Sequence, residues 1–191
     1  AFAKQLMADA GYPDGFTVKY DARQVGNYPD VCSVVKQQLS DTLGIEGNIA
    51  THESAAGYAL FGTSRAGTGD WELACQGEGM TVLDPDALLG GVYLKGGTRN
   101  YTDWEPEIAR TAFEAQKVEQ DPAKRQQLLK DYEDFLVPTN PDDISQGFDD
   151  NHWVTLYWGQ FFWLTHEDIR GFNAPATVQY SFKHEDLWLD R

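Results

Sequence analysis

The chain has 191 residues, of which 41% are hydrophobic and 13% aromatic. This length and composition suit one large or two small folded domains and exclude a disordered segment. The chain carries 30 acidic side chains against 15 lysines and arginines, for a formal net charge of −15. Such an excess of negative charge repels phosphate backbones and anionic headgroups, so nucleic acid and the membrane surface are excluded as expected partners.

Strand and helix patterns alternate in the first part of the chain. Strand-like patterns occur at residues 16–20, 45–50 and 71–75, and helical spacing occurs at residues 2–10, 29–43 and 54–65. The helix over 29–43 is the clearest, because Pro29 suits a first helical position and Gly44 ends the apolar repeat. This alternation predicts an α/β fold, with a mixed sheet flanked by helices.

A long connection after Cys75 leads to three further predicted helices. The first begins at Asp84, and the other two span residues 106–119 and 122–137. Residues 138–150 are polar and rich in Pro and Asp, which predicts a loop.

Aromatic side chains crowd one later segment. They are Trp153, Tyr157, Trp158, Phe161, Phe162 and Trp163. The segment resembles a hairpin that turns near Gly159, with Trp153 and Tyr157 on one strand face and Trp158 on the other. One face is expected to pack against the core. The other face either forms a stacking wall for a ligand or covers a neighbouring domain.

Motifs for catalysis or metal binding are weak. Ser33 and Lys36 match the S-x-x-K spacing of acyl-transferring serine enzymes, but the accompanying S-D-N and K-T-G motifs are absent. Neither H-E-x-x-H nor a zinc-ligand spacing with cysteine occurs among the histidines, which are His52, His152, His166 and His184. The sequence therefore predicts no enzyme activity, no metal site and no cofactor.

The two cysteines both have apolar neighbours. Cys32 falls in a predicted helix and Cys75 in a predicted buried strand. We expect two packed thiols, with a helix-to-strand disulfide as the alternative. Two cysteines are too few for a disulfide framework, so their number does not indicate a compartment.

Segments along almost the whole chain resemble the landmarks of one protein family. They are Ala3 to Phe16 (AKQLMADAGYPDGF), Tyr28 to Leu39, Trp71 to Ala74, Asp84 to Asp86, Asn100 to Thr102, Asp121 to Arg125, Gly171-Phe172 and Glu185 to Asp190. In this order, they resemble the peptide, dipeptide and nickel class (family 5) of ABC-transporter solute-binding proteins. The resemblance implies a periplasmic-binding-protein-like lobe.

Members of this family are much longer than the present chain. The resemblance therefore implies that residues 1–170 are the C-terminal lobe of a two-lobe protein, and that residues 171–191 pack toward a missing N-terminal lobe. It also implies an extracytoplasmic location, in the periplasm or lipid-anchored at the cell surface. The two lobes would close like a hinge over a peptide-like or oligosaccharide-like solute and present it to a membrane permease. The implied partners are the solute, the N-terminal lobe and an ABC permease.

The expected ligand contact follows the third predicted strand, because open α/β sheets bind ligands beyond the carboxyl ends of their strands. The predicted contact residues are Gln76, Glu78, Gly79, Met80 and Thr81, with support from Tyr157 or Trp158. In peptide-binding relatives this stretch reads G-W-x-x-D, and its aspartate pairs with the α-ammonium of the peptide. This chain has Thr81 at that position, and threonine cannot make the charge-assisted pair. Either Glu78 supplies a displaced carboxylate, or the ligand is a neutral polyol or oligosaccharide, or the loop only turns and caps the next helix.

Two other functions fit the same features. A carbohydrate-active hydrolase fragment would use a pair of the many carboxylates together with the aromatic segment. A solute-sensing domain of a signalling receptor would bind solute without feeding a permease. Activity of the purified chain on glycans would favour the hydrolase. Genes for an ABC permease and its ATPase beside the coding region would favour import over sensing.

Overall fold

The computed structural model describes residues 2–66, 69–79, 82, 84–136, 152–157, 159, 162–173 and 184–190. The chain forms two compact units. The first comprises Ala1–Glu78 and Tyr101–Asp103, and the second comprises Gly79–Asn100 and Trp104–Arg191. The predicted loop over residues 138–150 lies outside the described residues.

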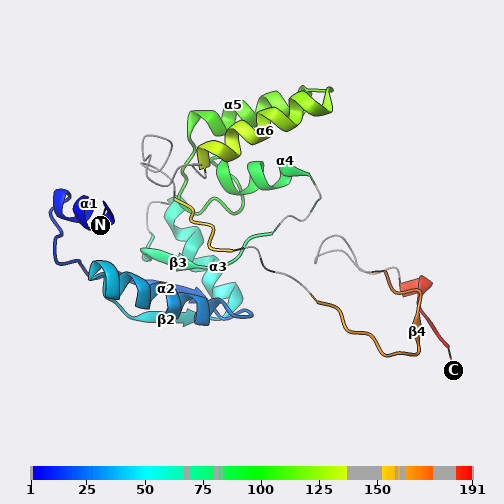
Figure 1. Ribbon diagram of the computed structural model, residues 1–191, viewed down its shortest axis with the longest axis horizontal. Coiled ribbons are helices and arrows are strands. Elements are labelled where there is room, and N and C mark those ends of the chain that lie inside the picture. Colours follow the sequence, from blue (N-terminus) through cyan, green and yellow to red (C-terminus); the bar gives the residue numbers. More distant parts are fainter. Residues whose placement is uncertain are drawn as a thin grey trace. The chain divides into compact units, whose positions relative to one another are not determined.

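A parallel sheet of three strands organises the first unit (Figure 1). The strands are β1 (Tyr20–Arg23), β2 (Ile49–His52) and β3 (Leu73–Cys75), and their order is β2-β1-β3. The α/β fold expected from the sequence is confirmed. A mixed sheet was expected, and the antiparallel pairing that the described residues show belongs to a separate two-stranded sheet.

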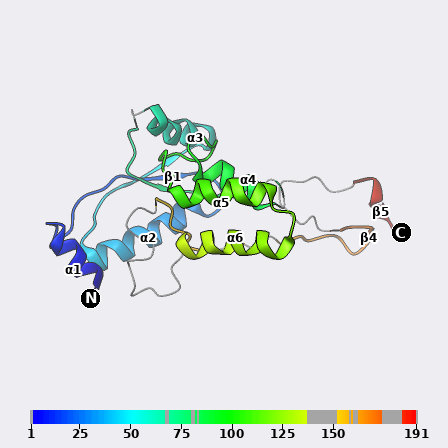
Figure 2. The same ribbon diagram turned by 90° about the horizontal axis from the view of Figure 1, so that it is seen from above.

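Helices cover both faces of the parallel sheet. α2 (Tyr28–Leu43) joins β1 to β2. α3 (Ser54–Gly62) and the 3-10 helix η1 (Thr63–Ala66) lie between β2 and β3, while α1 (Phe2–Asp9) precedes the sheet. Figure 2 shows α2 and α3 on opposite sides of the strands. Gly44 ends α2 in the left-handed region, as the sequence predicts.

The apolar core of the first unit lies between β1 and α2. Tyr20, Ala22 and Cys32 are all fully buried there and form one hydrophobic cluster. Side chains alternate along a strand, so Asp21 and Arg23 point to the opposite face, which α3 covers. All four residues of β1 are buried, although two of them are charged.

The central strand begins where the predicted strand over residues 16–20 ends. Before β1, only an isolated parallel bridge joins Thr17 to Glu46, and Val18 N donates to the Glu46 carbonyl at 2.8 Å. Regular pairing starts at Tyr20, because from there the chain has a strand on either side. The predicted position of this strand was therefore wrong. The alternating apolar residues lie in the segment that leads into β1, and β1 itself contains the charged residues Asp21 and Arg23.

Cys32 of α2 and Cys75 at the end of β3 form a disulfide, with their Cα atoms 5.6 Å apart. Cys75 is the register partner of Ala22, which places its side chain on the face that α2 covers. The expectation of two packed thiols was wrong, because strand pairing brings both sulfur atoms to the same core.

The first part of the second unit is helical. Its helices are α4 (Pro85–Leu88), the π-helix η2 (Leu89–Tyr93), α5 (Glu107–Val118) and α6 (Pro122–Leu136). The helices predicted over residues 106–119 and 122–137 are confirmed to within one residue at each end. A second hydrophobic core lies among them and contains Leu89, Leu94, Ala109, Ala112 and Tyr132.

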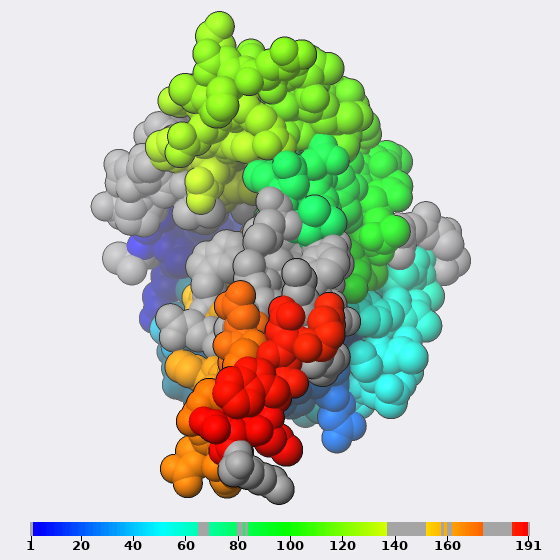
Figure 3. Space-filling model, turned by 90° about the vertical axis from the view of Figure 1, so that its right-hand side faces the viewer, coloured from blue at the N-terminus to red at the C-terminus, as the bar shows by residue number. Residues whose placement is uncertain are grey.

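A small antiparallel pair closes the described chain. β4 (Ile169–Arg170) pairs with β5 (Trp188–Leu189), and the 3-10 helix η3 (His184–Asp186) comes just before β5. Figure 3 shows the two segments side by side, in orange and red. Trp188 and Leu189 are each 57% exposed. The packing of residues 171–191 toward an N-terminal lobe stays a prediction.

The aromatic segment does not form the predicted hairpin in its described part. Residues 152–157 and 162–166 contain neither strand nor helix. Their apolar side chains are largely in solvent, with Val154 76% and Leu164 98% exposed. The alternation of apolar residues therefore did not predict the structure of this segment. A strand also needs a neighbouring strand to pair with, and the alternation says nothing about one.

Candidate functional site

The carboxyl ends of the three parallel strands meet at one edge of the sheet. With the order β2-β1-β3, the chain leaves β1 toward α2 on one face and reaches β3 by way of α3 on the other. Open α/β sheets bind ligands at such a switch point, outside the carboxyl ends of the strands. The candidate site, here called the strand-end site, consists of Arg23, Tyr28, His52 and residues 76–78.

Polar side chains from neighbouring strands form a row at this edge. Arg23 is the register partner of His52, and Gln76 directly follows the strand that pairs with β1 on its other side. Paired residues of a sheet share a face, so His52, Arg23 and Gln76 belong to the face that α3 covers. Asp21 lies on that face as well, and its Oδ1 atom is 2.7 Å from His52 Nε2.

Arg23 is buried at the end of the central strand, with 5% of its surface exposed. Its guanidinium carbon lies 3.8 Å from the centre of the Tyr58 ring and 5.6 Å from that of Tyr28. Gly57 lets α3 pass closely over this side chain, because a Cβ atom at that position would lie 2.6 Å from Arg23 Cγ. The Nε and Nη1 atoms of Arg23 are buried and have no hydrogen-bond partner among the described residues.

The loop after β3 packs against the start of α2. A Cβ atom on Gly77 would lie 2.2 Å from the Tyr28 hydroxyl oxygen, so only glycine fits this approach without movement of the tyrosine. The disulfide between Cys75 and Cys32 joins the end of β3, just before this loop, to α2. Gln76 and Glu78 are half-buried, and the buried Gln76 Oε1 atom has no partner among the described residues.

The structure places only part of the predicted ligand contact. Gln76 and Glu78 follow β3 and are part of the strand-end site, and their contact with a ligand stays a prediction. Gly79 is exposed and begins the second unit. Met80, Thr81 and Trp158 lie outside the described residues.

Tyr157, the remaining predicted contact, also belongs to the second unit and is 50% exposed. Its support of a ligand held by Gln76 and Glu78 stays a prediction.

Sequence reasoning did not find Asp21 and Arg23, and it gave His52 no role in a site. The signal that could have found them is the charge itself. A parallel strand between two others is buried on both faces and is normally apolar. An aspartate and an arginine inside such a strand are therefore more informative than a polar loop beside it.

The serine and histidine motifs gain no catalytic support. Ser33 Oγ donates to the Pro29 carbonyl at 2.9 Å, within its own helix. Among the described residues, no three His, Cys, Asp or Glu side chains are grouped so that they could hold a metal ion.

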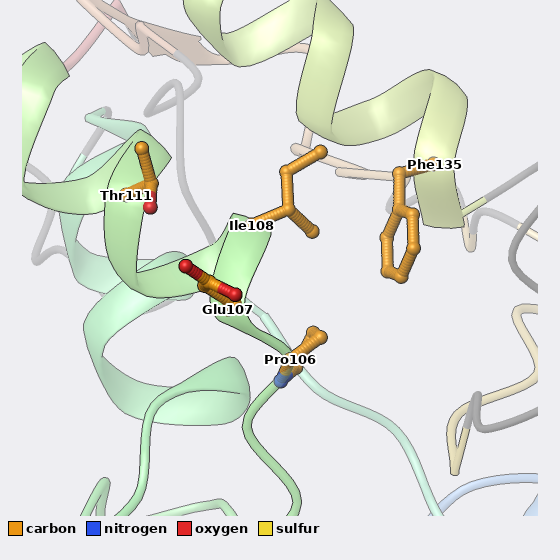
Figure 4. A pocket seen from close by; sticks show the side chains of 5 residues that line it. All are labelled: Pro106, Glu107, Ile108, Thr111 and Phe135. Carbon is orange, nitrogen blue, oxygen red and sulfur yellow. The ribbon is translucent and has the colours of Figure 1, made fainter.

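A separate hollow lies in the second unit, between the start of α5 and the end of α6 (Figure 4). Its volume is about 480 Å³, and its lining residues are Pro106, Glu107, Ile108, Thr111 and Phe135. Phe135 and Ile108 supply its apolar wall, and Glu107 supplies its one carboxylate. None of the predicted ligand residues lines it.

Neither a protein-family model nor a curated protein matches this sequence. Solved structures do match. The periplasmic binding protein DppA of Helicobacter pylori, in complex with the peptide STSA, shares 24% sequence identity over 66% of this chain and 24% of its own, with a TM-score of 0.55. A dipeptide-binding protein of Pseudoalteromonas sp. SM9913, in complex with Met-Leu, shares 18% identity over 68% of this chain and 26% of its own, with a TM-score of 0.60.

A third match is the binding protein AgaA of A. tumefaciens R10, in complex with agropinic acid, at 22% identity over 68% of this chain and 26% of its own, with a TM-score of 0.55. This chain has the periplasmic-binding-protein fold. The resemblance to peptide-binding ABC-transporter proteins is thereby confirmed at the level of the fold. The chain spans about a quarter of the length of these structures.

Within the described residues, every helix of this periplasmic-binding-protein fold is too short or too polar to cross a bilayer.

Proposed function

We propose that this chain is one lobe of an extracytoplasmic protein that captures a small solute for an ABC importer. The observation that carries the proposal is the shared fold, because the structural neighbours are binding proteins for peptides and for agropinic acid. Those neighbours are binding proteins and not enzymes, which favours capture over catalysis. The proposed partners are the solute, the N-terminal lobe of the same protein and a membrane permease.

The mechanism we propose is closure of two lobes around the solute. A ligand shifts such an equilibrium only as far as it binds the closed state more tightly than the open one, so it must contact both lobes. One lobe alone keeps half of the site, and most of the solute surface remains in water. The chain by itself is therefore expected to bind solute weakly.

The strand-end site is the proposed solute contact of this lobe. Gln76 and Glu78 would supply its hydrogen bonds. The other contacts predicted from the sequence are Gly79, Met80, Thr81 and Tyr157 or Trp158, and their part in the contact remains a proposal. A half-buried glutamine with an unpaired amide oxygen suits this role, because a ligand N–H or O–H can satisfy that oxygen. The proposed solute is peptide-like or oligosaccharide-like.

The disulfide supports the proposed location. Disulfides persist in oxidising compartments such as the bacterial periplasm or the cell surface and are rare in the cytosol. The bond between Cys32 and Cys75 fastens α2 to the strand that leads into the proposed solute contact.

Solute titrations followed by nuclear magnetic resonance test the proposal on the 191-residue chain. The probes are Met-Leu, the tetrapeptide Ser-Thr-Ser-Ala and maltotriose. We expect one of them to shift the backbone amides of residues 23–28 and 76–79 in a saturable way. Gln76→Ala should weaken that binding, whereas Gln38→Ala, an exposed change on α2, should leave it unchanged.

Saturable shifts confined to the hollow between α5 and α6, or hydrolysis of maltotriose, would contradict the proposal. Equal binding by the Gln76→Ala and Gln38→Ala variants would remove Gln76 from the site.

A further inference from the structure

We infer that the oxidation state of the disulfide between Cys32 and Cys75 sets the position of residues 76–78 in the strand-end site, and thereby the affinity of this site for solute. The control of the loop over residues 76–78 follows from the structure, whereas its effect on affinity rests on the proposed function. Neither cysteine is among the contacts that the sequence predicts.

The first argument is that the loop begins at the disulfide. Cys75 is the last residue of β3, and Gln76 follows it directly. In the described sheet β3 lies at an edge and pairs with β1 through Leu73, Ala74 and Cys75. So short a pairing holds a strand end weakly, because one hydrogen bond contributes only about 0.5–1.5 kcal/mol. The covalent bond to Cys32 is therefore the firmest attachment of the point at which the loop begins.

The second argument is that the loop and the disulfide meet the same part of α2. Gly77 lies against the first residue of this helix, since a Cβ atom on Gly77 would lie 2.2 Å from the Tyr28 hydroxyl oxygen. Cys32 comes about one helical turn after Tyr28 and is fully buried. Residues 75–77 are therefore held against one turn of α2 at two points, and a movement of Cys75 changes both.

The third argument is the change that reduction makes in the core. Sulfur atoms that are no longer bonded must separate to van der Waals contact, roughly 3.5–4 Å for non-bonded heavy atoms. Cys32 belongs to a helix of 16 residues and to the cluster with Tyr20 and Ala22, whereas β3 is a short edge strand. The end of β3 is therefore expected to move, and the displacement passes to Gln76.

A small displacement is enough to change a polar contact. Hydrogen bonds from N–H groups to oxygen occupy a narrow range of donor–acceptor distance, about 2.7–3.2 Å. The buried Oε1 atom of Gln76 has no partner among the described residues, and the position of Gln76 decides whether a solute donor can reach that oxygen. Reduction is therefore expected to weaken the proposed contact between Gln76 and the solute.

The reductant is a dithiol, because dithiols break protein disulfides by exchange. One thiolate of the dithiol attacks the sulfur of Cys75, which is partly exposed, whereas Cys32 is fully buried. The S–S bond breaks, and Cys32 leaves as a thiolate that takes up a proton. The second thiol of the dithiol then displaces Cys75 from the mixed disulfide. Two electrons and two protons pass to the chain, and the dithiol becomes a cyclic disulfide.

Backbone amide resonances of the ¹⁵N-labelled chain test the control of the loop. The oxidised chain is compared with the same chain in dithiothreitol. We expect the amides of residues 28–32 and 75–78 to shift on reduction, whereas those of β2 and α5 keep their positions. The double variant Cys32→Ala and Cys75→Ala is the control, and dithiothreitol should leave its spectrum unchanged.

Two outcomes of this comparison would overturn the inference. The amides of residues 76–78 could keep their positions on reduction, which would show that the loop is held without the disulfide. The amides of β1 and β2 could move to unfolded positions together with those of the loop, which would make the disulfide only a brace of the whole first unit.

Solute affinity in the two oxidation states tests the second half of the inference. The probe is whichever of Met-Leu, Ser-Thr-Ser-Ala and maltotriose binds the oxidised chain. We expect it to bind roughly tenfold more weakly after reduction, as for one lost hydrogen bond. Such coupling is reciprocal, so the bound probe should make the reduction potential of the disulfide about 30 mV more negative.

The two measurements separate this inference from the proposed function. Equal affinity of a probe for the oxidised and the reduced chain would overturn the control of affinity and leave solute capture standing. If no probe binds the oxidised chain, the claim about affinity falls with the proposed function, and the amide shifts still decide whether the disulfide positions the loop.

Discussion

Tyr132 brings a hydroxyl group into the core of the second unit. The residue is 3% exposed, and its ring meets the Tyr93 ring edge-on, with the centroids 5.6 Å apart. Its hydroxyl oxygen is buried without a hydrogen-bond partner among the described residues. Burial raises the pKa of Tyr132 far above its ordinary value, and the neighbouring Tyr93 adds to the effect. The hydroxyl therefore stays protonated and unpaired in the core.

Replacing Tyr132 by phenylalanine should leave the unfolding free energy unchanged or raise it by up to about 1 kcal/mol, because no hydrogen bond is lost and a buried polar group is removed. Urea unfolding of the chain measures this. Tyr20→Phe is the matched control, since the Tyr20 hydroxyl donates to the Ile45 carbonyl at 3.4 Å. The control should lose about 0.5–1.5 kcal/mol. An equal loss in both variants would contradict the prediction.

Gly11 and Gly15 have the same φ of 88° in different surroundings. A Cβ atom on Gly11 would meet nothing within 4 Å, whereas one on Gly15 would lie 2.0 Å from the Gly44 carbonyl oxygen. Gly11→Ala should destabilise the chain by about 1–2 kcal/mol through backbone strain alone. Gly15→Ala should destabilise the chain by about 1–3 kcal/mol more than Gly11→Ala, because the added Cβ atom forces the backbone to shift. Thermal unfolding compares the two, and equal losses would show that Gly44 moves away freely.

At the scale of elements, α4 is tied to α5 and α6 by polar side chains. Asp84 Oδ1 caps α4 by accepting from the Asp86 N–H at 2.9 Å and also accepts from Arg125 Nη2 at 2.7 Å. Gln116, which is 1% exposed, donates to Asp86 Oδ1 at 2.7 Å and accepts from Arg125 Nη2 at 2.6 Å. The short helix α4 therefore depends on residues far along the chain.

This network should make the second unit sensitive to acid. The hydrogen bond from Arg125, and then that from the Asp86 backbone, hold the pKa of Asp84 below its ordinary value of 3.8. A carboxyl with a lowered pKa in the folded state stabilises that state above its unfolded pKa and stops doing so as the pH falls through the folded one. Stability should thus decline below about pH 3.8.

An Asp84→Asn variant should show a shallower decline in acid than the parent chain, because asparagine does not titrate. Chemical unfolding at a series of pH values measures the slope. Asp9→Asn, an exposed change on α1, is the control and should keep the parent slope. If the Asp84 variant follows the parent curve below pH 3.8, the network does not contribute to the acid response.

At the scale of the whole molecule, the described residues form two hydrophobic cores. Tyr20, Ala22 and Cys32 belong to the first unit, and the cluster around Tyr132 belongs to the second. The disulfide lies entirely within the first unit. Stability is therefore expected to be divided between two cooperative units.

Calorimetry of the chain should show two unfolding transitions. The double variant Cys32→Ala and Cys75→Ala should lower the unfolding free energy of the first unit by about 2–4 kcal/mol, because the disulfide restricts the unfolded chain. The other transition should stay in place. Dithiothreitol should reproduce the effect on the parent chain and have none on the double variant. A single transition that shifts as a whole would show that the two units unfold together.

The sequence by itself determined the α/β class, the helices α2, α5 and α6, and the loop after β3 as a candidate contact. Helices can be predicted because their hydrogen bonds and caps lie within a few residues, as with Pro29 and Gly44 around α2. The position of Gln76 after a strand is likewise a local property.

Only the tertiary structure decided where the central strand lies, that the cysteines are bonded, and that Asp21, Arg23 and His52 share one buried face. A strand gains its hydrogen bonds from distant segments, so β1 is fixed by β2 and β3 and not by its own alternation. The burial of Arg23 depends on Gly57 and Tyr58 of a helix that comes after the next strand. Such encounters have no local sequence signal, because the contacts that stabilise them join residues far apart in the chain.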